Sequence, residues 1–326
     1  MKLNALGRYL PAFTSASKQA AETLYLDLFS GSIENTHRET GEAIRGSVEL
    51  ALSTSPEFSR LVLCELDTRK AASLREYVQT HHPGRNVVVL EGDCNKSIPA
   101  YLHTLAVDDP RSRRAAVFAF VDQYSADVTW EALQALAAFR HGAKKTELWL
   151  YFGDSFIRRG LSTGEDYFRR VDAMFGDQRW REIHEGRAQG MLDAEEEKKE
   201  LVNLMRWRLQ HSLGYRRTIP LRVTRSTGHD LYTMIFATDH PVGEKIMTQV
   251  LGVAESELQE LARRKRRAAQ LDKREAEAGG AGFDILNDWA DAVPLEEDSS
   301  PGLLLLDEPH SPWRLYPNEE PPLARS

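Results

Sequence analysis

The sequence predicts an α/β fold built on a mostly parallel, Rossmann-like sheet that finishes with an antiparallel pair of strands. Short apolar runs alternate with segments of helical periodicity through the first half of the chain. These runs are almost continuously apolar, which is typical of parallel strands covered on both faces. Two further strand-like runs, separated by the short stretch STGH, predict the antiparallel pair.

Each expected element can be read in order. The first five expected strands are TLYLDLF, RLVLCELD, NVVVLEGD, AAVFAFVD and KTELWLYFGD. The segments between them with helical spacing are GSVELALSTS, TRKAASLREYVQTHH, KSIPAYLHTLAVDD and WEALQALAAFRH. A mostly helical insertion, about residues 154–217, follows the fifth strand and is expected to cap the ligand edge of the sheet. The strands YRRTIPLRVTR and DLYTMIFATD and the helix GEKIMTQVLG then complete the fold.

The C-terminal part of the chain differs in composition. We expect one Rossmann-like domain over residues 1–254, a charged helix over 255–278, and an acidic, proline-rich tail over 279–326. The tail carries ten acidic residues and two arginines, so it accounts for the whole net charge of −7. We expect it to be largely disordered, with short docking segments at FDILNDW and PGLLLLDEPHSPW.

Several classes of protein are disfavoured by composition. The longest apolar runs fall short of 18 residues, and the first residues lack a signal-peptide pattern, so we expect a cytoplasmic protein with no membrane span. Two cysteines, Cys64 and Cys94, cannot form a disulfide framework or a four-cysteine metal site. The histidines show no metal-ligand spacing, and we predict no metal site.

Acidic residues stand at the ends of four expected strands, where open α/β sheets bind ligands. Glu65 can accept hydrogen bonds from both ribose hydroxyls of a nucleoside cofactor, and Asp93 can meet an adenine amino group. Asp27 can fix the first loop or a cofactor amine, and Asp122 ends the fourth strand. Each of them alone is more often a helix cap, and we assign Asp67 to that role. The four together favour an adenosine-binding site.

The first loop indicates which cofactor the site would take. It reads YLDLFSGSIEN and keeps one glycine, Gly31, of the pattern G-x-G-x-x-G that binds a pyrophosphate. S-adenosylmethionine has no phosphate and suits this looser loop, so NAD and ATP are disfavoured. The segment GLLLLDEPH imitates a Walker B strand but has no P-loop partner in the sequence. We interpret it as a docking peptide or a coincidence.

An ordered set of short motifs resembles the three-Cys-motif partner family, TcmP. The motifs run from about residue 24 to 252 and read DLFSG, GSVELAL, CELD, EGDCN, FVDQYSADVTW, KTELWLYF and YTMIFATDHPVGEKIM. The resemblance implies a class I methyltransferase-like fold, S-adenosylmethionine as cofactor, and a partner protein with an iron–sulfur, radical S-adenosylmethionine-like three-cysteine motif. The implied cofactor-binding residues are Asp27, Phe29, Gly31, Glu65, Asp93, Cys94 and Asn95.

The resemblance also bears on the segment Asp122-Gln123-Tyr124-Ser125. It stands where the family has D-P-Y-G, a tetrapeptide similar to the catalytic one of amino-methyltransferases, which implies catalytic roles for Asp122, Gln123 and Tyr124. The absence of proline predicts a looser turn. In similar proteins the first helix begins at the GS of GSVELAL, so we expect a long loop over residues 31–45 and an N-cap at Ser47.

Two alternatives remain open from the sequence. The chain can be a methyltransferase, or a noncatalytic scaffold of the same fold that binds the iron–sulfur protein or nucleic acid. The basic block RRKRR, residues 263–267, can contact nucleic-acid phosphates. It can equally be a solvated helix face whose charge is nearly cancelled by flanking acidic residues.

Overall fold

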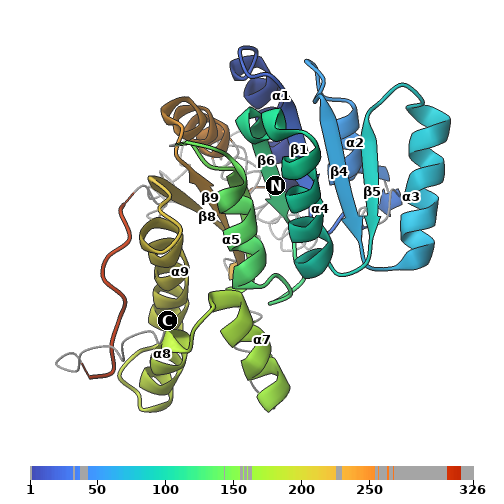
Figure 1. The fold of residues 1–326 in the computed structure, drawn as a ribbon. Helices are drawn as coiled ribbons and strands as arrows, with labels where there is room; N and C mark the ends of the chain where they lie inside the picture. Colours follow the sequence, from blue (N-terminus) through green and yellow to red (C-terminus); the bar gives the residue numbers. More distant parts are fainter. Residues whose placement is uncertain are drawn as a thin grey trace, which may run out of the picture.

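The computed structural model in Figure 1 describes most of the chain. The described residues are 2–31, 34–36, 43–142, 144–154, 157, 160, 164–224, 230–253, 256, 263, 267 and 307–316.

A seven-stranded mixed sheet forms the centre of the fold, in the order β5-β4-β1-β6-β7-β9-β8. The strands β1, β4, β5, β6 and β7 are parallel, and β9 pairs antiparallel with both β7 and β8. This arrangement confirms the predicted Rossmann-like sheet and its antiparallel strand pair. The strands span Thr23–Asp27 (β1), Arg60–Glu65 (β4), Val87–Glu91 (β5), Ala116–Val121 (β6), Glu147–Phe152 (β7), Arg217–Thr224 (β8) and Asp230–Thr238 (β9).

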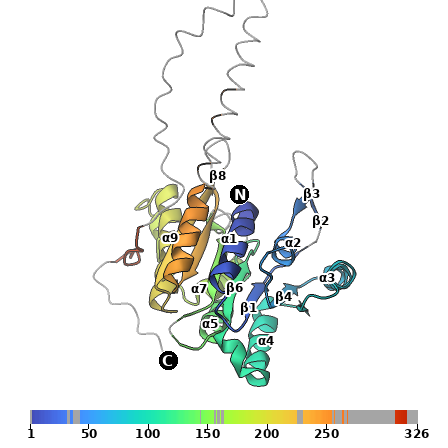
Figure 2. The same cartoon turned by 90° about the horizontal axis from the view of Figure 1, so that it is seen from above.

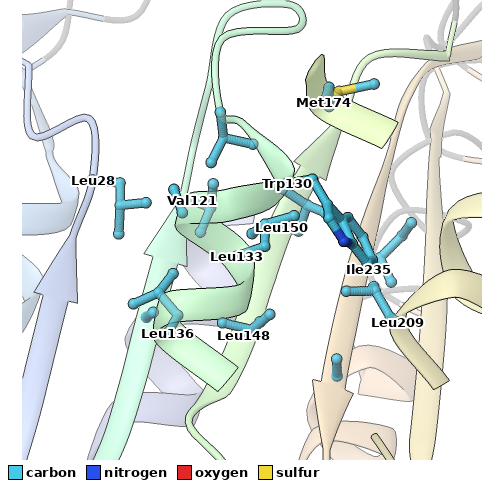
Figure 3. Packing of buried hydrophobic residues seen from close by; sticks show 14 of the residues in the cluster. Leu28, Val121, Trp130, Leu133, Leu136, Leu148, Leu150, Met174, Leu209 and Ile235 are labelled. Carbon is cyan, nitrogen blue, oxygen red and sulfur yellow. The ribbon is translucent and has the colours of Figure 1, made fainter. Parts of the chain in front are cut away.

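Helices cover both faces of the sheet, as the continuously apolar strands require. Figure 2 shows α4 and α5 on one side and α1 on the other. Side chains of β6 alternate between the two apolar clusters: Val121 faces α5, whereas Phe120 faces α1. In Figure 3, Leu133 and Leu136 of α5 pack over the strands. The helices are α1 (Lys2–Ala16), α2 (Ser47–Leu52), α3 (Thr68–His81), α4 (Cys94–Asp108) and α5 (Trp130–Phe139), with a 3-10 turn η1 (Pro110–Arg114) after α4.

The N-terminal helix α1 was not among the expected elements. Its buried residues include Leu6, Tyr9, Leu10 and Phe13, which lie at helical spacing and pack against the sheet. Pro11 lies within the helix. A proline within so short a segment argues against a helix, and here burial of the apolar face outweighs that cost.

The first loop differs from the expected long loop over residues 31–45. It contains a two-stranded antiparallel sheet, β2 (Glu34–Thr36) and β3 (Ala43–Arg45). The predicted N-cap at Ser47 is also wrong, because Gly46 holds the cap position and no side chain caps α2. Ser47 instead donates a hydrogen bond from its hydroxyl to the buried carboxylate of Asp27.

The predicted helical insertion after the fifth strand is confirmed. It contains α7 (Glu165–Phe175), α8 (Arg179–Ala188) and α9 (Ala194–His211). A capping box starts α9, in which Asp193 accepts from the backbone of Glu196 and the Glu196 side chain accepts from that of Asp193. The apolar side of the insertion joins the cluster on the α5 face of the sheet.

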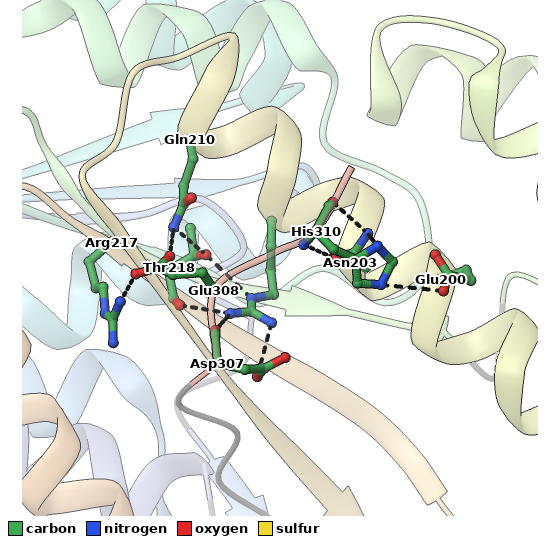
Figure 4. Close-up of polar contacts among 9 residues, drawn as sticks. Glu200, Asn203, Gln210, Arg217, Thr218, Asp307, Glu308 and His310 are labelled. Carbon is green, nitrogen blue, oxygen red and sulfur yellow. Dashed lines mark hydrogen bonds and ion pairs between the residues drawn. The ribbon is translucent and has the colours of Figure 1, made fainter. Parts of the chain in front are cut away.

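A segment of the acidic tail, residues 307–316, packs against α8, α9 and β8. Asn203 exchanges hydrogen bonds with the backbone of His310 (Figure 4). Arg206 donates to the carbonyl oxygen of Asp307. The ring of Trp313 lies against Gly186 of α8. This segment overlaps one of the two expected docking segments. The other, FDILNDW, lies outside the described residues.

The remaining C-terminal predictions fall largely outside the described part of the chain. Within 255–278, Ser256, Arg263 and Arg267 are described and are helical. None of the helices in the described part is long and apolar enough to cross a membrane.

Candidate functional site

A cavity of about 660 Å³ lies at the carboxyl edge of the sheet. The strand order reverses between β1 and β6, and open α/β sheets bind ligands at that switch point. The volume lies within the range of small-molecule sites. Eight predicted site residues line the cavity together, namely Phe29, Gly31, Glu65, Asp93, Cys94, Asn95, Asp122 and Tyr124.

Glu65, at the end of β4, is fixed by the backbone of two neighbouring segments. Its Oε2 accepts a hydrogen bond from the Gly31 N–H at 2.8 Å, and its Oε1 accepts one from the Asp67 N–H at 2.9 Å. Gly31 has φ of +67°, a conformation that favours glycine. Each carboxylate oxygen keeps a further lone pair, so Glu65 can accept hydrogen bonds from two adjacent hydroxyl groups.

Three of the cavity residues surround the start of α4. Asp93 is the N-cap of that helix and accepts a hydrogen bond from the Asn95 N–H at 3.0 Å. Asp93 therefore caps a helix and also lines the cavity. The Asn95 side chain bonds the backbone of Asp127 and Thr129, each at 2.8 Å, and ties α4 to the loop after β6. Burial raises the pKa of the Cys94 thiol, which makes it a poor nucleophile.

Asp27 lies beneath the cavity and does not line it. Its carboxylate is fully buried and accepts from the Phe29 N–H at 3.2 Å and from the Tyr25 hydroxyl at 3.2 Å. Burial raises the pKa of this carboxyl to about 6, against the hydrogen bond from Ser47 and with a contribution from the negative charge of Asp122. Of the two roles expected for Asp27, the contacts match the one that fixes the loop.

Gln123 is not placed to act on a ligand, which corrects its assignment as a catalytic residue. Its side chain is 1% exposed. The amide Nε2 donates to the Tyr151 carbonyl oxygen at 3.0 Å, and Oε1 accepts from the Asp127 and Val128 N–H groups, each at 2.8 Å. The predicted loose turn is therefore also wrong, because this buried amide anchors the turn in place of proline.

The other two residues of the tetrapeptide reach the cavity. Tyr124 is 78% exposed at its rim, a position that leaves its ring accessible to a flat group. The carboxylate of Asp122 contacts the ammonium group of Lys2, with Nζ and Oδ1 2.5 Å apart. An acidic side chain and an aromatic ring thus stand beside the same cavity.

The helical insertion supplies residues that the sequence reasoning missed. Arg170 of α7 lines the cavity and pairs with Asp127, and Tyr167 of the same helix shares a 2.5 Å hydrogen bond with Ser125. Both contacts tie α7 to the loop after β6. For Arg170, the only available signal was the expectation that the insertion caps this edge. Asp127 lies within the motif FVDQYSADVTW, but the motif did not indicate its contacts.

Hydrogen-bond acceptors line the cavity together with apolar and aromatic surface. Carboxylates from β4 and β6, the cap of α4, and apolar and aromatic surface from Phe29 and Tyr124 surround one space. Within the described residues, no three His, Cys, Asp or Glu side chains are grouped so as to hold a metal ion. The arrangement can accept hydrogen bonds from hydroxyl and amino groups.

Comparisons with known proteins add little to this geometry. No protein-family model matches the chain, and no curated protein matches it. Among solved structures, the chain is similar to the crystal structure of protein LPL1258 from Legionella pneumophila str. Philadelphia 1, of the family model DUF519. The sequence identity is 11% and the TM-score is 0.43, over 78% of this chain and 91% of the other.

Proposed function

We propose that this chain binds S-adenosylmethionine in the cavity at the β1/β6 switch point. The observation that carries the proposal is the placement of Glu65, whose two oxygens are oriented by the Gly31 and Asp67 N–H groups at the end of the second parallel strand. A carboxylate there suits the ribose hydroxyls of a nucleoside. Asp93 and Phe29 would lie near the adenine, and the single glycine of the first loop suits a cofactor without phosphate.

Methyl transfer to a nitrogen is the reaction that we propose for the site. S-adenosylmethionine supplies a methyl group on a sulfonium, whose sulfur is a good leaving group. Asp122 would accept a hydrogen bond from the attacking nitrogen and take up the proton that the nitrogen releases as the N–C bond forms. Tyr124 would stack on the acceptor. The contribution of the protein is alignment of the two reactants, which the anchoring of the turn by Gln123 supports.

The family resemblance extends the proposal to a partner and a location. We propose that the protein acts in the cytoplasm with an iron–sulfur protein of the three-Cys-motif type. A contact with nucleic acid through residues 263–267 is a further proposal, supported by the exposure of Arg263 and Arg267. The charges between them lie outside the described residues.

One observation favours the alternative of a noncatalytic scaffold. The Asp122 carboxylate, which the methyltransferase mechanism needs, is engaged by Lys2 of the same chain. A scaffold would bind its partner with this contact intact and would transfer no methyl group.

Label transfer from S-adenosylmethionine separates the two proposals. The full chain would be incubated with methyl-labelled cofactor, the iron–sulfur partner and candidate amine acceptors, alongside the Asp122→Ala variant. The methyltransferase proposal expects label in an acceptor with the native chain and a loss of at least a hundredfold in the variant. Binding of the partner by both proteins, with no labelled product from either, would support the scaffold.

A further inference from the structure

The ammonium group of Lys2 sits in a small cluster of groups that suit a cation. Its Nζ lies 2.5 Å from Asp122 Oδ1, 5.5 Å from the centroid of the Tyr151 ring and 5.8 Å from that of Tyr232. The two rings are 4.6 Å apart and tilted by 37°, so they offer adjacent faces. Carboxylate and aromatic faces at these distances are a recognised combination for binding ammonium groups.

The three residues that surround Lys2 are held by the core of the fold. Tyr151 belongs to β7 and is 6% exposed, and Tyr232 belongs to β9 and packs against the same apolar cluster. Asp122 follows β6 directly. We call Asp122, Tyr151 and Tyr232 the cation cluster. Because its members come from the ends of three adjacent strands, their spacing is set by the sheet.

The cation cluster adjoins the proposed cofactor site through one shared residue. Asp122 lines the 660 Å³ cavity and also contacts Lys2. A nitrogen bound to Asp122 in place of Lys2 would therefore lie beside that cavity. The occupant of this position decides whether an external amine can reach Asp122.

Local helix energetics do not explain why Lys2 stands there. Lys2 is the first residue of α1, and a positive charge at a helix N-terminus is opposed by the helix dipole. The contact is therefore favoured by the cation cluster and not by the helix that carries Lys2. The cluster also indicates the charge of its ligand. The two ring faces attract a cation electrostatically, and a neutral amino group on a nucleobase would lack this attraction.

We propose that the cation cluster is a binding site for a primary alkylammonium group, and that Lys2 occupies it as an internal competitor. An external amine enters when the Lys2 side chain leaves. Taken together with the proposed function, on which this last step rests, the inference makes a primary alkylamine the methyl acceptor and Lys2 a regulatory residue. A bound alkylammonium ion has no lone pair, so it would first transfer one proton to the Asp122 carboxylate. The neutral amine would then accept the methyl group and leave as a methylammonium ion. Tethering gives Lys2 a high effective concentration at the cluster, so a free amine competes poorly while α1 remains docked.

The test uses the full chain and n-butylammonium, which reproduces the four-carbon stem and charge of a lysine side chain. Binding would be measured by NMR titration of the native protein and of the Lys2→Ala variant, with Lys18→Ala as a matched control. Lys18 is exposed and lies just beyond α1. We expect Lys2→Ala to bind n-butylammonium at least tenfold more tightly than either the native chain or Lys18→Ala.

Two further measurements define the groups responsible. Adding Asp122→Asn to Lys2→Ala should abolish the gain, and neutral n-butanol should not reproduce it. Equal affinity of native and Lys2→Ala protein for n-butylammonium, or equal affinity of the variant for n-butanol, would overturn the inference. These titrations contain no S-adenosylmethionine, so they test amine binding separately from methyl transfer. Failure of the amine-binding inference can therefore be distinguished from failure of the proposed function.

Discussion

Replacing Gln123 by alanine would test whether this residue anchors the turn beside the site. The substitution removes four hydrogen bonds: Nε2 donates to the Tyr151 carbonyl oxygen and to Sδ of Met174, and Oε1 accepts from the Asp127 and Val128 N–H groups. A hydrogen bond contributes about 1 kcal/mol net, and buried groups left without partners cost more. Since the side chain is 1% exposed, water cannot replace all of the lost contacts. We expect the free energy of unfolding to fall by about 3 kcal/mol.

Urea unfolding of Gln123→Ala and of a matched glutamine variant provides the assay. Gln178 is exposed and makes a single side-chain bond to Asp172, so Gln178→Ala should lower the free energy of unfolding by less than about 0.5 kcal/mol. If Gln123→Ala cost no more than the control, the turn would not depend on this amide. A normal stability with a lost ligand response would instead return Gln123 to a direct role at the site.

Two other predictions concern the buried carboxylate and the tail. The pKa of Asp27 is about 6 in the folded protein against an ordinary 3.8, so folding favours the protonated carboxyl. The stabilisation that results is fully present below about pH 4 and is lost as the pH rises through 6. The loss is about 3 kcal/mol, and denaturant unfolding across this range should show it in the native chain but not in Asp27→Asn. In Gly186→Ala, the new Cβ would lie 2.2 Å from Cη2 of Trp313, so residues 307–316 should be displaced and cleaved faster by protease. Gly252→Ala, with open space around the Cβ, should leave cleavage unchanged; equal rates in both variants would refute the packing of Trp313.

The sheet was accessible from the sequence because burial on both faces leaves a simple pattern. Each of β1, β4, β6 and β7 is an apolar run with nearly every residue buried. Since parallel strands place their carboxyl ends at one edge, the acidic residues that end β4 and precede α4 could be expected near one another. The structure places Glu65 and Asp93 at the same cavity.

Contacts between distant segments were not accessible in the same way. The meeting of Lys2 with Asp122 joins residues 120 positions apart, and nothing in the local sequence around Lys2 signals it. Arg170 and Asp127 were missed for the same reason. Gln123 was misassigned because its position in a motif suggested chemistry, whereas its burial and its four hydrogen bonds could be known only once the turn was folded.

Prediction of helix N-caps from residue type failed where the side chain makes a tertiary hydrogen bond instead. Serine is a common N-cap residue, yet the Ser47 hydroxyl donates a hydrogen bond to Asp27, and Gly46 occupies the N-cap position of α2. Asp67 shows the opposite outcome, because it caps α3 as predicted by accepting from the Arg69 and Lys70 N–H groups. The difference is that the Asp67 carboxylate is exposed and accepts from N–H groups of its own helix, whereas the Ser47 hydroxyl donates to a buried carboxylate.

The most direct test of the central claim is calorimetric titration of the full chain with S-adenosylmethionine and S-adenosylhomocysteine. Glu65→Ala is the test variant. Glu91→Ala is the matched control, because Glu91 pairs with Glu65 in the sheet register but bonds Thr68 and Arg75 instead of lining the cavity.

Loss of two hydroxyl hydrogen bonds to a carboxylate corresponds to about 3 kcal/mol, or about a hundredfold in Kd. We predict micromolar binding by the native chain and Glu91→Ala, weakened by that factor in Glu65→Ala. The absence of binding at millimolar cofactor by folded native protein would contradict the adenosine site, and with it the proposed function.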